Sequence, residues 1–172
     1  MGWILLGACG GGQGGGLSTR AITAEEAEPL CAADCQHDID CGFESDLAFC
    51  TSNCVGQIVG WQRADAADII LECAAALGCE VFGNEQCLVG IRPLAIHEEW
   101  ETRCRVQLSG CLGDFQDEEQ VCESTPDGLD AGFISLIAAE LMPDIIACLD
   151  GPDCNERVDC LTFQFETHNI DF

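Results

Sequence analysis

The sequence predicts an all-α fold, a disulfide-rich bundle of short helices, with two repeated helical modules as a further expectation. Three observations favour it. Apolar residues make up 48% of the 172 residues and recur at helical spacing. Tyrosine is absent, and there are no long alternating runs of Val, Ile and Thr of the kind that build a β-sandwich. Fifteen cysteines are typical of a small exported protein that is held together by disulfides.

Residues that begin and end helices define seven helical segments, at 24–36, 46–58, 64–77, 96–109, 115–123, 130–149 and 153–163. Thr23 and Glu26 form a capping box before the first, and Ser45-Asp46 offers an N-cap to the second. Gly78 is suited to follow the end of the third. Pro143 lies inside the sixth segment, which we therefore expect to kink or to restart there.

Two Cys-x3-Cys pairs, Cys31/Cys35 and Cys50/Cys54, mark a helical hairpin. A spacing of four places both thiols of a pair on one face of a helix, so two antiparallel helices can be joined twice. We therefore expect two nested disulfides, Cys31–Cys54 and Cys35–Cys50. The crossed alternative needs parallel helices or a shear of about one turn. The spacing resembles that of the α-hairpinins, small helical hairpins with two nested disulfides. Some α-hairpinins inhibit trypsin-like proteases through a basic loop residue, a role that does not carry over because this loop has no Lys or Arg.

The cysteine spacing also contains a weak internal repeat. The pattern Cys-x5-Cys-x7-Cys at 73–87 is similar to Cys-x5-Cys-x5-Cys at 148–160. A rival frame aligns residues 35–41 with residues 154–160, and the sequence leaves both frames open.

The repeat divides the chain into an eight-cysteine helical module at 23–92 and a six-cysteine helical module at 93–172. Both numbers are even, so each module can close its own disulfides. In the shared frame, Cys104 and Cys122 correspond to the inner cysteines of the hairpin. We therefore expect a Cys104–Cys122 disulfide in the second module.

The N-terminus predicts export and a lipid anchor. Residues 1–8 are apolar, are too short to span a bilayer, and are interpreted as the end of a signal peptide. The Leu-Gly-Ala-Cys sequence that ends at Cys9 resembles the lipobox of bacterial lipoproteins. The resemblance implies that Cys9 carries the lipid, that 9–22 is the anchor cysteine with a Gly-rich tether, and that Gly10 favours the outer membrane. The alternative is a chance match in a sequence rich in Gly and Ala.

The charge balance excludes several classes of partner. There are 31 acidic residues against six arginines, there is no lysine, and the net charge is −25. Such a chain repels phosphates, so nucleic acid and anionic lipid surfaces are not expected as partners. Without lysine, Walker-type phosphate binding and Schiff-base chemistry are excluded as well.

No catalytic residue, metal site or cofactor is predicted. The histidines His37, His97 and His168 are far apart, and His97 lacks the second histidine of a zinc-protease helix, so a solvated helix face is its expected environment. His37 lies between two cysteines and could complete a metal site in a reducing cell. No Cys-x2-Cys occurs, and no acidic cluster has EF-hand spacing.

These observations lead to two hypotheses about function. The first is a lipid-anchored, disulfide-stabilised protein of the cell envelope, with a structural or macromolecule-binding role and a protein or envelope polymer as partner. We do not expect an enzyme. The alternative is storage of Cu(I), because helices with Cys-x3-Cys pairs resemble those of copper-storage proteins, whose thiolates hold that ion.

Overall fold

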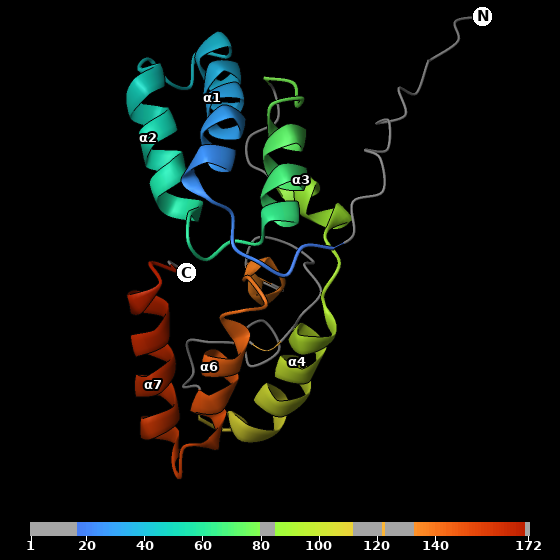
Figure 1. Ribbon diagram of the computed structural model, residues 1–172, viewed down its shortest axis with the longest axis vertical. Helices are drawn as coiled ribbons and strands as arrows, with labels where there is room; N and C mark the ends of the chain where they lie inside the picture. The colour runs from blue at the N-terminus through green and yellow to red at the C-terminus, as the bar shows by residue number, and fades with distance from the viewer. Residues whose placement is uncertain (1–16, 80–84, 112–121, 123–132, 171–172) are drawn as a thin grey trace, which may run out of the picture.

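The computed structural model describes residues 17–79, 85–111, 122 and 133–170, which form helices and no strands (Figure 1). The α-helices are α1 (Ala24–Asp40), α2 (Leu47–Ile58), α3 (Ala64–Ala74), α4 (Ala95–Gln107), α6 (Met142–Ala147) and α7 (Cys154–Thr167). Three 3-10 helices complete the set, η1 (Glu85–Gly90), η2 (Phe133–Leu136) and η3 (Cys148–Asp150). With the seven disulfides described below, this architecture confirms the predicted all-α, disulfide-rich fold.

The predicted capping residues set the starts of the first two helices. The Thr23 hydroxyl accepts the N–H of Glu26 at 3.4 Å, and the Glu26 carboxylate accepts the N–H of Thr23 at 3.1 Å. The Asp46 carboxylate accepts the N–H of Phe49 at 3.0 Å at the start of α2. These bonds satisfy N–H groups that a helix leaves without internal partners.

The helix expected over 130–149 is interrupted, and its expected restart at Pro143 is confirmed. The described residues of this segment form η2, an extended stretch at Ile137, and then α6 and η3. The helix cannot continue because Leu136 and its neighbours give their backbone groups to another part of the chain. It restarts at Met142 with Pro143 in its first turn, where the missing proline N–H costs nothing. Of the segment expected at 115–123, only Cys122 lies within the described residues.

Seven disulfides join all fourteen cysteines from Cys31 to Cys160. The pairs are Cys31–Cys54, Cys35–Cys50, Cys41–Cys79, Cys73–Cys87, Cys104–Cys122, Cys111–Cys154 and Cys148–Cys160. The first four lie within the group of α1, α2, α3 and η1, which we call the first module. The other three lie within the group of α4, α6, η3 and α7, which we call the second module. In Figure 1 the first module forms the upper half of the molecule and the second forms the lower half.

The two modules share one pattern of disulfide connectivity. Setting aside Cys31–Cys54, each module has six cysteines, of which the first pairs with the third, the second with the fifth and the fourth with the sixth. This pattern matches the frame that aligns 73–87 with 148–160. The rival frame fails because Cys35 pairs with a later cysteine, whereas its counterpart Cys154 pairs with an earlier one.

The modules differ in the size of the core behind these disulfides. In the first module, two small clusters are built largely from alanine and isoleucine: Ile22, Ala27, Ala64 and Ala67, and Ala66, Ile70, Leu88 and Ile91. The second module has one larger cluster, which includes Trp100, Leu108, Ile134, Met142, Leu149 and Phe165. The extra disulfide therefore belongs to the module that buries less apolar volume.

Trp100 occupies the position in the second module that Cys31 occupies in the first. Cys31 lies four residues before Cys35, and Trp100 lies four residues before Cys104, so both face inward from the same helical turn. Both side chains are fully buried. The second module thus has a large aromatic side chain where the first has a covalent link.

Backbone hydrogen bonds join the modules at the segment between α2 and α3. The N–H of Ile22 donates to the carbonyl of Gln62 at 2.8 Å, and the N–H of Arg63 donates to the carbonyl of Leu136 at 2.6 Å. The bridges Ala21–Arg63 and Gln62–Ile137 have the antiparallel geometry of a sheet. We call this region the junction. From the sequence, the tether is expected to cover 9–22. The residues from Thr19 to Ile22 do not belong to it, because they form part of the junction.

Arg63 is the buried charge of the junction. Its guanidinium is fully buried and donates two hydrogen bonds to Asp65, at 2.9 and 2.6 Å. It also donates to the carbonyls of Arg92 and Ser135, both at 2.9 Å. The cation is therefore paired, and it links the start of α3 to backbone that lies before α4 and within η2.

Candidate functional site

In the helical hairpin of α1 and α2, α1 has buried residues whereas α2 is more exposed. None of the residues of α2 is fully buried, although the helix is apolar in composition. Leu47 and Phe49 have 38% and 68% of their surface exposed. The disulfides Cys31–Cys54 and Cys35–Cys50 join α2 to α1, and Val55 and Ile58 of α2 pack against one small core cluster.

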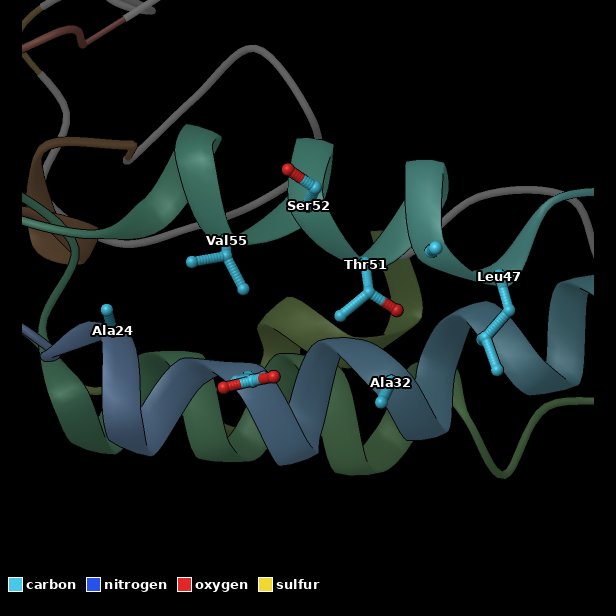
Figure 2. Close-up of a pocket in the computed structure, with 8 residues that line it drawn as sticks. Ala24, Ala32, Leu47, Thr51, Ser52 and Val55 are labelled. Carbon is cyan, nitrogen blue, oxygen red and sulfur yellow. The ribbon is translucent and has the colours of Figure 1, made fainter.

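A groove runs between α1 and α2, with a volume of about 600 Å³ (Figure 2). In Figure 2, Leu47, Thr51 and Val55 extend from α2 toward α1, which presents Ala24 and Ala32 opposite them. Alanines on α1 leave the space that the groove occupies. The full lining is Ala24, Glu28, Ala32, Leu47, Ala48, Thr51, Ser52 and Val55.

The groove is largely apolar, with one carboxylate in its lining. Glu28 is the charged residue of the lining, which contains no cation. On the same helix, burial and then the nearby Asp38 raise the pKa of Asp34 above its usual range. A ligand that fits this groove has an apolar anchor and carries positive charge or is neutral.

A second hollow, of about 570 Å³, lies on the other side of α2. It lies between the exposed face of α2 and Asn169, which follows α7, and its lining residues are Phe49, Ser52, Asn53, Gly56, Gln57 and Asn169. Ser52 lines both hollows, so α2 forms a wall of each. We therefore take α2, with the groove beside α1, as the candidate binding surface.

The structure pairs the hairpin cysteines as the sequence analysis expects, as Cys31–Cys54 and Cys35–Cys50. It also joins Cys104 to Cys122, a bridge whose two cysteines are both fully buried. Cys9, the predicted lipid attachment site, lies outside the described residues.

The expectation that His97 lies on a solvated helix face is wrong, because its side chain is fully buried. Its Nδ1 accepts the N–H of Leu94 at 2.9 Å, so the ring proton is on Nε2, which donates to the carbonyl of Ile137 at 3.0 Å. Burial lowers the pKa of His97 to about 4. The imidazole is thus a neutral structural group that caps α4 and holds the extended stretch at Ile137.

Sequence reasoning missed both Arg63 and His97 as organising residues. A weak signal existed for Arg63, since it is one of six cations in a chain of 31 acidic residues and Asp65 follows two positions later. Nothing in the local sequence indicates that either side chain is buried, because their partners at 92, 135 and 137 are distant in the chain.

The described residues contain no helix that is long and apolar enough to cross a membrane. No protein-family model, no curated protein and no solved structure matches this chain.

Proposed function

We propose that this is a lipid-anchored, disulfide-stabilised protein of the cell envelope that binds a protein partner through α2 and the groove beside α1. Seven disulfides are typical of a protein exported to an oxidising compartment. The lipobox-like sequence that ends at Cys9 supports the anchor, and Gly10 supports the outer membrane. The proposed role is binding without catalysis or cofactor.

The observation that carries the binding role is the exposure of α2. None of the residues of α2 is fully buried, Val55 and Ile58 pack only at the edge of a small core cluster, and two disulfides join the helix to α1. Rigid apolar surface lowers the entropic cost of binding, so such a helix is suited to recognition. Glu28 in the groove and the net charge of −25 favour a protein partner with a basic or neutral contact surface.

Site-specific photo-crosslinking in cells tests the binding surface. A photoreactive phenylalanine derivative replaces Phe49 on α2, and the matched control replaces Val106 on α4, whose exposure of 71% is close to the 68% of Phe49. We expect Phe49 to yield a discrete protein adduct that the control does not yield. Phe49→Asp should weaken capture of that partner by about tenfold or more, since it places a charge at the centre of an apolar contact. Equal adducts at the two positions would refute the binding role.

Labelling with palmitate tests the anchor independently. We expect the wild-type chain to carry the label, and Cys9→Ser to lose the label and release the protein from membranes. Membrane attachment that persists in Cys9→Ser would contradict the lipoprotein assignment.

Thiol counting separates the proposal from Cu(I) storage. Denatured but unreduced protein should show no free thiol beyond Cys9, and its mass should be lower by two hydrogens for each of the seven bridges. Free thiols at most positions, together with several bound Cu(I) ions per chain, would instead establish the storage function.

A further inference from the structure

We propose that Cys41–Cys79 is a reducible disulfide which, once opened by a dithiol, forms a zinc-binding site with His37. The ligand atoms of these three residues already lie within 4.8 Å of one another. This proposal does not depend on the binding role of α2.

The Cys41–Cys79 bridge is the most accessible of the seven. Cys79 is exposed and Cys41 is half-buried, whereas five of the other bridges contain at least one buried cysteine and both cysteines of Cys111–Cys154 are half-buried. Thiol–disulfide exchange requires in-line access to a sulfur, so an external thiolate reaches Cys79 first.

His37 is placed to assist the opening of this bridge. Its Nε2 lies 3.5 Å from Cys41 Sγ and donates its hydrogen to the carbonyl of Leu77 at 2.6 Å. One thiolate of the dithiol attacks Cys79 Sγ, the Cys79–Cys41 bond breaks, and Cys41 leaves as a thiolate beside the His37 N–H. The second thiol of the reductant then attacks the mixed disulfide and releases Cys79. The reductant loses two electrons and two protons and becomes a disulfide, and the two cysteines gain them.

The geometry after reduction suits a tetrahedral zinc ion. Zinc binds imidazole nitrogen at about 2.0–2.1 Å and thiolate sulfur at about 2.3 Å, so neighbouring nitrogen and sulfur ligands lie about 3.6 Å apart. The observed separation of 3.5 Å between His37 Nε2 and Cys41 Sγ already matches this edge. The two residues lie four positions apart at the end of α1, which keeps them on one face. Cys79 completes three protein ligands, and the fourth position is open to water.

Asp38 supplies the outer contact that zinc-bound histidines commonly have. Its carboxylate lies 3.7 Å from Nδ1, on the far side of the His37 ring from Cys41. When zinc takes Nε2, the ring proton moves to Nδ1, where a carboxylate can accept it after a small approach. The acidic surroundings also favour a cation over an anion.

The second module contains an internal control for this site. Cys111–Cys154 is the counterpart of Cys41–Cys79 in the shared connectivity. Four residues before Cys111 the chain has Gln107, where the first module has His37. Cys111 Sγ lies 3.5 Å from the backbone carbonyl of Gln107, so no imidazole takes part there. The two bridges thus share their topology and differ in the histidine.

The test is graded reduction of the full chain by dithiothreitol, with differential alkylation and peptide mapping. We expect Cys41 and Cys79 to become alkylated first, while Cys111 and Cys154 stay joined. Partly reduced protein should then bind one Zn²⁺ per chain in a competition with a chromophoric chelator. Cobalt(II) in place of zinc should give a thiolate-to-metal charge-transfer band. First opening of any other bridge would overturn the proposal.

Four variants test the zinc site. His37→Gln copies the second module and should weaken Zn²⁺ binding by at least about 100-fold, while Asp38→Asn should weaken it by about tenfold. Cys41→Ala/Cys79→Ala should abolish the cobalt band, and this test still applies if His37→Gln fails to fold. The matched control, Cys111→Ala/Cys154→Ala, should retain the band. Zinc binding that is absent from the reduced wild type, or that is unchanged in His37→Gln, would refute the site.

Discussion

Arg63 makes one guanidinium responsible for contacts with three segments that are distant in the chain. It donates to Asp65 within α3 and to carbonyls at residues 92 and 135, all from a fully buried position. Burying a cation is costly unless it is paired and hydrogen-bonded, and here four hydrogen bonds, two of them to the carboxylate of Asp65, take up four of the five guanidinium N–H groups. The residue therefore stabilises the junction only as long as its partners stay in place.

Arg63→Ala should lower the free energy of unfolding by about 3–5 kcal/mol, because it leaves Asp65 and two carbonyls without their donor. The free energy of unfolding of Arg63→Lys should lie between those of Arg63→Ala and the wild type, since an ammonium cannot reproduce the planar arrangement of guanidinium donors. Guanidinium denaturation with the disulfides intact provides the measurement. The control is Arg103→Ala, which removes a more exposed ion pair with Asp150 and should cost no more than about 1 kcal/mol. Equal costs for Arg63→Ala and Arg103→Ala would contradict the role assigned to Arg63.

His97 should make stability fall as the solution is acidified. Its pKa is about 4 in the folded chain, where burial disfavours the imidazolium, against 6.5 in the unfolded chain. Between these values the unfolded chain binds more protons, so the free energy of unfolding decreases as pH falls from 6.5 to 4 and then levels off. The loss should be about 3 kcal/mol. The difference between wild type and His97→Gln, measured at pH 4, 5, 6 and 7, isolates this residue; a difference that does not change with pH would exclude it as the cause.

The helical hairpin shows how much element structure the local sequence determines. Its capping residues and its two Cys-x3-Cys pairs predict the starts of α1 and α2 and the nested pairing that the structure has. The candidate groove was not predictable, because it depends on alanines of α1 lying opposite side chains of α2. The break after η2 was not predictable either, since the backbone that interrupts the helix comes from residues 61–63.

Removing the outer disulfide of the hairpin should lower the free energy of unfolding only modestly, because the loop that it closes is already short. Cys31→Ala/Cys54→Ala should cost about 2 kcal/mol, at the low end for a disulfide, because Cys35–Cys50 still closes the same hairpin. In the second module, Trp100→Ala should cost about 3–5 kcal/mol, because its cavity opens in a larger core. Thermal unfolding of both variants decides the matter. A Trp100→Ala variant as stable as the wild type would show that the aromatic side chain does not replace the missing bridge.

At the scale of the whole molecule, a net charge of −25 on 172 residues opposes compactness. Raising the ionic strength from 0.01 to 0.15 M shortens the screening length from about 30 to about 8 Å and weakens this repulsion. We therefore expect added NaCl to raise Tm at pH 7 by roughly 3–6 °C, equivalent to about 1–2 kcal/mol. Near pH 4.1, the isoelectric point, the salt effect should largely vanish. A salt effect of the same size at both pH values would point to a cause other than charge.

Because no disulfide crosses between the modules, the pairing of fourteen cysteines becomes two separate problems. Fourteen thiols oxidised together admit about 135,000 pairings, whereas eight admit about 105 and six about 15. During export the N-terminal eight can close before the remaining six emerge from the translocation channel. Confining the pairs to their own modules reduces the number of possible pairings by nearly a hundredfold.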